Sequence, residues 1–307
     1  MENIVTIESD KYSAKVNISK GANCISLRND KYDAIILREP DYSKEIDNPY
    51  IYGMPILFPP NRISGGKFEF EGREYNFPIN EQATGCHLHG KLHTLPFEIN
   101  SYGKNFVECI YNSDENYNYF PHKFTVTVKY TITGNGLLQE TKITNLSDKN
   151  MPNFLGFHTT FNIQFTQNSN PLNVRVFADV DEEIERDTKS YIPTGNIIKD
   201  DIVAKKLRCG SFAPFKNQIS KHYKSRNNGD IILFDTQNNI KVIYENDENF
   251  KWRLFYNGNG DEYICLEPQT CMVNCPNTPF DRDYTGFDSI APFSSKKYTS
   301  KIYIKED

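Results

Sequence analysis

Hydrophobic and polar residues alternate over much of this chain, and a period of two is typical of β-strands that bury one face. The longest alternating run covers 124–133, and after a Gly-Asn-Gly turn the alternation continues over 137–143. A second pair of alternating runs, 67–70 and 74–77, flanks a Glu-Gly-Arg turn and predicts a β-hairpin. The other predicted strands cover 231–234 and 240–244, which form a second hairpin, and 251–256, 263–266 and 298–304.

Helical periodicity is nearly absent. At most, a short turn of helix is expected over 181–189, and the polar stretch 216–230 is expected to be the longest loop. The chain contains neither a linker rich in Ser, Gly and Pro nor an internal repeat, so residues 1–307 are predicted to form a single domain. Many closely spaced strands favour an all-β fold, a large antiparallel β-sandwich.

Composition argues against several classes of function. The net charge is −5, and Lys and Arg do not cluster in the way that nucleic acids or anionic membranes require. We recognise no signal peptide, and no apolar run approaches the ~18 residues of a membrane span, so the protein is expected to be soluble and cytoplasmic. The seven cysteines include no Cys-x-x-Cys pair, which favours reduced, buried thiols over a zinc ribbon.

Three of the six histidines, His87, His89 and His93, lie close together in the sequence. In an extended strand His87 and His89 would point to the same side, so a metal site is conceivable. A cupin-like site needs a carboxylate three or four residues after the second histidine, and here the next one is Glu98. Polar residues near a turn are the favoured interpretation of His87 and His93.

Two further segments carry candidate acid–base residues. His158 lies in an apolar, aromatic stretch, where a single histidine is by itself more typical of a structural residue. Glu267 follows the largely apolar run 263–266 and precedes Pro268, which is expected to end the strand. A carboxylate at the end of a buried strand is costly unless it is paired or used, but this segment alone also fits a glutamate that faces solvent.

Taken in order, these segments resemble the motifs of the aldose 1-epimerase family. Asn61-Arg62-Ile63 is similar to the family's Asn-Arg element, and a hairpin follows it, as in the family. The later matches are Leu88-His89-Gly90, then His158-Thr159-Thr160-Phe161-Asn162, and last Cys265-Leu266-Glu267-Pro268-Gln269. Each match is short, but their collinear order on a strand-rich chain extends the resemblance over nearly the whole sequence.

The resemblance implies both a fold and a reaction. The fold would be the galactose mutarotase-like supersandwich, and the reaction the interconversion of the α and β anomers of an aldose through the open-chain aldehyde. Glu267 would act as base on the anomeric hydroxyl and His158 as acid at the ring oxygen, with no metal and no cofactor. The substrate-binding residues that the resemblance implies are His89, Arg62, Asn61 and Gln269.

Two features of the family are missing. Members that act on free galactose or glucose usually carry a sugar-binding aspartate in the region that corresponds to 218–228, and this chain has none there. The family's glutamine near 253–256 is also absent, so the substrate contacts are expected to differ. A close variant would act on phosphorylated or acidic sugars, and the cations available for it are Lys221, Lys224, Arg226 and Arg253.

The leading hypothesis is therefore a hexose 1-epimerase whose partner is a small sugar, with neither nucleic acid nor membrane involved. The alternative is a catalytically silent carbohydrate-binding protein on the same fold, because fold does not establish function. Such a protein would have little reason to keep both proton-transfer positions. A metal-dependent sandwich enzyme that uses His87, His89 and His93 is the third hypothesis.

Overall fold

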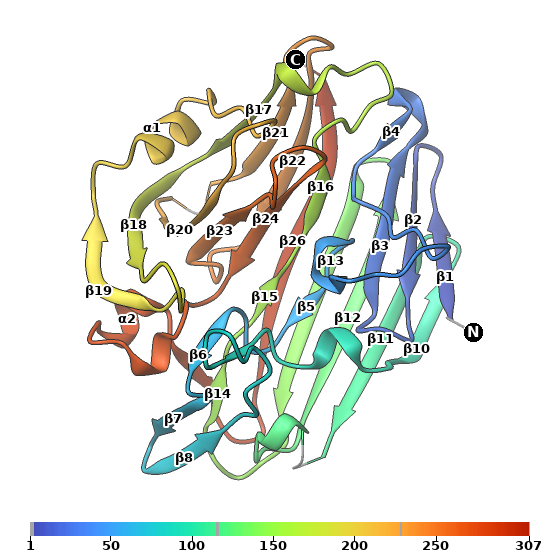
Figure 1. The fold of residues 1–307 in the computed structure, drawn as a ribbon. Coiled ribbons are helices and arrows are strands. Elements are labelled where there is room, and N and C mark those ends of the chain that lie inside the picture. Colours follow the sequence, from blue (N-terminus) through green and yellow to red (C-terminus); the bar gives the residue numbers. More distant parts are fainter. Residues whose placement is uncertain (1–2, 115–116, 228, 307) are drawn as a thin grey trace.

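The computed structural model describes residues 3–114, 117–227 and 229–306, and antiparallel sheets dominate it (Figure 1). The first large sheet has the strand order β10-β11-β12-β13-β26-β22-β21-β17. Its strands are β10 (Glu98–Gly103), β11 (Phe106–Ser113), β12 (Phe124–Thr133), β13 (Gly136–Asn145), β17 (Val174–Ala178), β21 (Ile231–Asp235), β22 (Ile240–Asn246) and β26 (Ser295–Glu306).

The second large sheet has the order β19-β18-β20-β23-β24-β15-β5, and β16 also pairs with β24. Its strands are β5 (Ile56–Leu57), β15 (Gly156–Phe157), β16 (Thr160–Asn162), β18 (Val180–Arg186), β19 (Pro193–Ile198), β20 (Ser220–Ser225), β23 (Trp252–Tyr256) and β24 (Tyr263–Gln269). One continuous cluster of buried side chains joins the two sheets, for example Val128 of the first and Ile264 of the second. A single domain over residues 1–307 remains a prediction.

Smaller elements surround these sheets. A four-stranded sheet, β1 (Ile4–Glu8), β2 (Tyr12–Asn17), β3 (Asn23–Asn29) and β4 (Ala34–Ile35), packs beside β11, β12 and β13 (Figure 1). The two-stranded pairs are β6 (Arg62–Ser64) with β9 (Cys86–Leu88), β7 (Lys67–Phe70) with β8 (Arg73–Asn76), and β14 (Met151–Asn153) with β25 (Asp288–Ile290). The helices are α1 (Ile202–Arg208) and α2 (Arg282–Thr285), with 3-10 turns at Asp30–Tyr32, Pro49–Ile51, Leu92–Thr94, Tyr117–Tyr119, Pro171–Asn173 and Cys275–Asn277. Of the described helices, none has the length and apolarity needed to cross a bilayer.

Alternation explains the strands that the sequence predicts well. Along β12 the even positions from Phe124 to Ile132 are completely buried, and the intervening residues are partly or fully exposed. Every second side chain therefore faces the core, which is what a period of two requires. The predicted hairpin at 67–77 is confirmed as β7 and β8, whose turn residues Glu71 and Gly72 both have positive φ.

Three predictions about local structure were wrong. The segment 181–189, predicted to hold at most a turn of helix, mostly belongs to strand β18. The predicted loop 216–230 contains strand β20, although residue 228 lies outside the described residues. Pro268 does not end its strand, because β24 continues through it to Gln269.

Pro268 is tolerated because it faces an interruption in the neighbouring strand. On either side of it, Leu266 donates its N–H to the carbonyl of Thr159, and Thr270 donates to that of Leu155. The missing N–H of Pro268 therefore falls opposite the gap between β15 and β16. That gap contains His158.

Candidate active site

Side chains from many parts of the chain line one cavity of about 530 Å³, and five of them are candidates for its chemistry. Glu267 comes from β24, and His158 from the gap between β15 and β16. His89 directly follows β9, while Arg62 begins β6 and Arg186 ends β18. The volume lies within the range that small-molecule sites occupy.

Glu267 and His158 form a buried pair at this cavity. Glu267 Oε1 lies 3.3 Å from His158 Nε2, and the two side chains are 1% and 7% exposed. Burial raises the pKa of Glu267 to about 8, although Gln269, which donates Nε2 to Glu267 Oε2 at 3.2 Å, opposes the rise. Burial also lowers the pKa of His158 to about 3. In the free protein the single proton of the pair therefore resides on Glu267.

His89 and Asn61 hold each other in place. The N–H of Asn61 donates to His89 Nδ1 at 3.1 Å, and the N–H of His89 donates to the carbonyl of Asn61 at 3.0 Å. Burial lowers the pKa of His89 well below its usual value, so its ring is neutral and carries its proton on Nε2. Within the described part of the chain, Asn61 Nδ2 has no hydrogen-bond partner. The cavity wall thus offers two N–H donors to a polar ligand.

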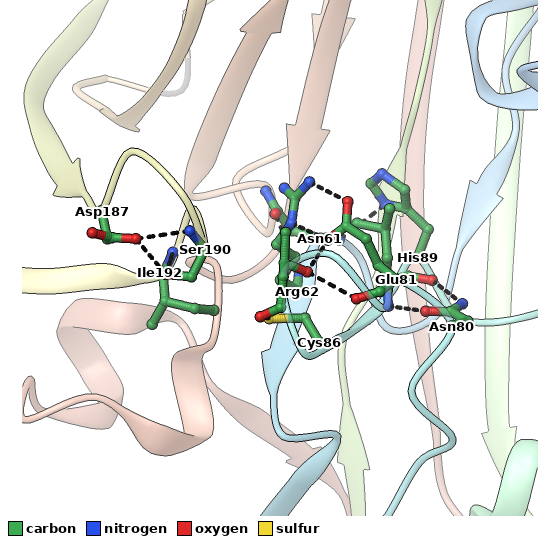
Figure 2. Close-up of polar contacts among 11 residues, drawn as sticks. Asn61, Arg62, Asn80, Glu81, Cys86, His89, Asp187, Ser190 and Ile192 are labelled. Atoms are coloured by element: carbon green, nitrogen blue, oxygen red, sulfur yellow. Dashed lines mark hydrogen bonds and ion pairs between the residues drawn. The ribbon is translucent and has the colours of Figure 1, made fainter.

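Arg62 is fixed by a carboxylate on its side of the cavity (Figure 2). Its Nε and Nη2 each donate to one oxygen of Glu81 at 2.6 Å, and Thr84 also donates to Glu81. The ring of Tyr191 covers the Arg62 guanidinium at 4.6 Å. This bidentate pair orients Arg62 and cancels its charge.

The turn that carries Tyr191 is tied internally. Asp187 Oδ1 accepts a hydrogen bond from the N–H of Lys189. It also accepts from the N–H and hydroxyl of Ser190, which lies beside it in Figure 2. Tyr191 adopts a left-handed φ of 57° and donates its N–H to the carbonyl of Asp187. The turn therefore positions both Arg186, which precedes it, and Tyr191.

The three clustered histidines have different surroundings. Strand β9 ends at Leu88, and His89 has a left-handed φ of 61°, so His87 and His89 do not share one side as an extended strand would require. His87 stacks on Phe77 and bonds the carbonyl of Pro78. Among the described residues, the one group of potential ligands whose atoms all lie within 4.8 Å of each other is His158, Cys265 and Glu267.

A family model described as aldose 1-epimerase matches residues 3–304. The chain belongs to the aldose 1-epimerase family. Its likeness to solved structures confirms the predicted fold class, a large antiparallel β-sandwich of the galactose mutarotase-like type.

Several relatives of this aldose 1-epimerase family member extend the comparison. An uncharacterized protein of Escherichia coli, YihR, is 23% identical over 287 residues, which cover 90% of this chain and 87% of the relative. The crystal structure of a galactose mutarotase-like protein from Clostridium acetobutylicum has a TM-score of 0.94 at 28% identity, over 100% of this chain and 96% of the other. A galactose mutarotase-like protein from Lactobacillus casei has a TM-score of 0.78 at 18% identity, over 99% and 100% of the two chains, which supports the fold alone.

Five of the six residues singled out from the sequence of this family member line the cavity, namely Glu267, His158, His89, Arg62 and Asn61. The sixth, Gln269, is fully buried and contacts Glu267 instead.

The cations suggested for acidic sugars lie outside the cavity wall. Lys221 pairs with Glu183 and Asp201, and Arg253 is buried against backbone carbonyls.

Sequence reasoning missed several residues of the cavity wall, four of which have ring or charged side chains that matter for the site. They are Tyr50, Glu81, Arg186 and Tyr191. The ring of Tyr50 lies 4.6 Å from that of His89 and 6.0 Å from that of His158, which provides an aromatic surface beside the buried pair. Tyr50, Glu81 and Tyr191 lie outside the strands, where hydrophobic periodicity carries no signal.

Proposed function

We propose that this protein is an aldose 1-epimerase that interconverts the α and β anomers of a sugar at the cavity of Glu267 and His158. The observation that carries the proposal is the buried pair itself. A carboxyl group and an imidazole 3.3 Å apart provide two proton-transfer groups, and mutarotation needs one base and one acid on the same substrate.

Ring opening with this pair takes three proton transfers. Passage of the shared proton from Glu267 to His158, across 3.3 Å, gives a carboxylate and an imidazolium. Glu267 then takes the proton of the anomeric hydroxyl as the bond from C1 to the ring oxygen breaks, and the ring oxygen takes its proton from His158. Rotation about the C1–C2 bond and the reverse transfers close the ring on the other face.

The remaining residues of the wall bind and orient the sugar in this proposal. The Nε2–H of His89 and the free Nδ2 of Asn61 donate to oxygens of the substrate, and Arg62 is held ready by Glu81. Tyr50 and Tyr256 offer apolar ring surface to a face of the sugar. Gln269 acts as a positioning residue, because it contacts the carboxyl group of Glu267.

Anomer exchange measured by NMR tests the proposal. Glucose, galactose and a panel of other aldoses, including phosphorylated and acidic ones, are compared with and without the protein. Glu267→Gln and His158→Asn should each lower kcat by ~10²–10⁴-fold while the fold is kept. Exposed Glu69→Gln is the matched control for the glutamate. Near-full activity in either site variant would refute the role given to that residue.

The second candidate function is a silent carbohydrate-binding protein, favoured by the missing aspartate in 218–228. It predicts saturable sugar binding by calorimetry, with no acceleration of anomer exchange for any sugar of the panel.

A further inference from the structure

Arg186 is a cation of the cavity wall that forms no ion pair with a carboxylate among the residues that the structure describes. It ends β18, and its Nη2 donates to the carbonyl of Ser220 at 2.6 Å, with the Ser220 hydroxyl at 3.4 Å. Over the described ranges of the chain, no carboxylate forms an ion pair with Arg186. Such an arrangement is destabilising, because removing a charge from water costs free energy and contacts with carbonyl oxygens recover only part of it.

The acids around Arg186 are engaged elsewhere or stand apart. Glu183, on the same strand, is held by Lys221 at 2.5 Å, and Lys221 also contacts Asp201 at 3.0 Å. Asp47 lines the same cavity but is exposed to solvent at its rim. Glu183 and Asp201 are thus both paired with Lys221, and Arg186 remains in the cavity wall without such a pair.

The other charges of the cavity wall compensate one another near neutral pH. Arg62 is cancelled by the bidentate contact of Glu81. His158 is uncharged because burial lowers its pKa to about 3, and Glu267 mostly holds its proton because burial raises its pKa to about 8. The interior of the cavity therefore keeps one net positive charge, on Arg186.

We propose that the aldose bound in this cavity carries an anionic group, a carboxylate, phosphate or sulfate, and that Arg186 recognises this group. The inference deepens the proposed function and rests on it for the turnover measurements. A guanidinium presents a planar fork of N–H donors, which matches all three anions.

The strand order places this contact away from the reacting carbon. β20 and β23 separate β18 from β24, so the backbones at Arg186 and Glu267 are roughly 14 Å apart at about 4.8 Å per strand spacing. The guanidinium of Arg186 bonds Ser220 of β20, the strand next to β18, and β20 is two strands away from β24. The anionic group therefore belongs to a part of the sugar remote from the anomeric carbon, which Glu267 and His158 address.

Substrate preference tests the proposal. Anomer exchange is measured for glucose, glucuronate, glucose 6-phosphate and glucose 6-sulfate with the wild type, Arg186→Met and Arg186→Lys. We expect at least one anionic aldose to exceed glucose in kcat/KM by ~10-fold or more, and Arg186→Met to reduce that ratio by ~10–100-fold. Arg186→Lys should restore part of it. The favoured substrate identifies the anion.

Arg175→Met is the matched control, because Arg175 is also a half-buried strand arginine that donates to backbone carbonyls but lies outside the cavity wall. It should leave the ratio unchanged. Equal losses for glucose and for every anionic aldose in Arg186→Met, or glucose as the best substrate, would overturn the inference.

Binding of unreactive analogues separates this inference from the proposed function. The 1,5-anhydro forms of glucose, glucuronate and glucose 6-phosphate lack the anomeric hydroxyl and cannot mutarotate. If no aldose turns over but an anionic analogue binds and loses affinity in Arg186→Met, the epimerase activity fails and the anion site stands. If aldoses turn over but the anionic analogues bind no better than the neutral one, the anion site fails and the activity stands.

Discussion

Glu267 differs from a surface glutamate because burial and the neighbouring side chains shift its pKa in opposite directions. Burial raises its pKa, whereas the amide of Gln269 and the guanidinium groups of Arg186 and Arg62 favour the charged form, and the outcome is a pKa of about 8. Because burial lowers the pKa of His158 to about 3, the pair holds one proton between these two values. That is the protonation state from which the proposed reaction starts.

The activity should therefore decline above pH about 8, where Glu267 loses its proton and the pair no longer contains an acid. Enzyme-catalysed anomer exchange, corrected for the spontaneous rate at each pH, should show this alkaline limb in kcat/KM. A profile that stays level to pH about 9.5 would contradict the assignment of the limb to Glu267.

Replacing Gln269 should shift the pH at which kcat/KM declines on the alkaline side. Its Nε2 donates to Glu267 Oε2 at 3.2 Å and stabilises the carboxylate, so Gln269→Met should raise the pKa of Glu267 and shift the limb to higher pH. If Gln269 only filled space, the variant would change the rate without displacing the limb, and the pH profile distinguishes the two cases.

The same carboxyl group should limit stability at high pH. The folded protein binds its proton more tightly than the unfolded chain does, so this contribution to stability is present at low pH and is lost as pH rises through about 8. Glu267→Gln cannot ionise, and its Tm should exceed that of the wild type at pH 9 by more than it does at pH 6. The exposed Glu69→Gln should show no such pH-dependent difference.

At the scale of elements, the sequence predicts those strands whose two faces differ. β12 was predicted with its observed bounds because its buried and exposed positions alternate. β18 was missed because its inward-facing residues include Glu183, which Lys221 neutralises, and β20 because His222 and Tyr223 are both buried in succession. In both strands neighbouring residues are buried in succession, so an alternation of polar and apolar residues does not mark which positions are buried.

Within the candidate site, too, some residues could be predicted from the local sequence and others could not. Glu267, His158, His89, Arg62 and Asn61 were found because short motifs carry them in order along the chain. Arg186 was overlooked because nothing in the local sequence distinguishes an arginine with a partner from one without. Pairing is decided by contacts between strands, here between Glu183 on β18 and Lys221 on β20.

The turn after β18 allows a test of how a local element positions side chains of the cavity wall. Asp187→Ala removes the acceptor of three hydrogen bonds in this turn and should loosen both Tyr191 and Arg186. Because Glu267 lies on β24 and His158 between β15 and β16, away from this turn, KM should rise by up to about 10-fold, with kcat affected less. Asn170→Ala, which removes the acceptor of a turn outside the cavity wall, is the control. A selective loss of kcat would contradict this description.

At the scale of the whole molecule, the first sheet depends on β26. This strand pairs with β13 on one side and with β22 on the other, over eight and seven residue pairs. Its removal would leave β13 and β22 as two unpaired edges in the middle of the sheet (Figure 1).

Deletion of residues 295–307 should therefore abolish cooperative thermal unfolding and promote aggregation. Deletion of residues 1–8 removes only β1, an edge strand of the four-stranded sheet, and should lower Tm while a cooperative transition remains. Calorimetry and size-exclusion chromatography of the two truncated proteins make the comparison. A folded, monomeric product of the first deletion would show that β13 and β22 can pair directly.

The position of β26 also sets the order of events during synthesis of the protein. The ribosome releases β13 long before β26, and the strands that occupy the far half of the first sheet emerge in between. Until residue 306 has left the ribosome, the two halves of that sheet have no strand to join them, and their edges can pair with other chains. The first sheet of the nascent chain should therefore be completed only once β26 has emerged, and chaperones that shield strand edges should raise the yield of the protein in the cell.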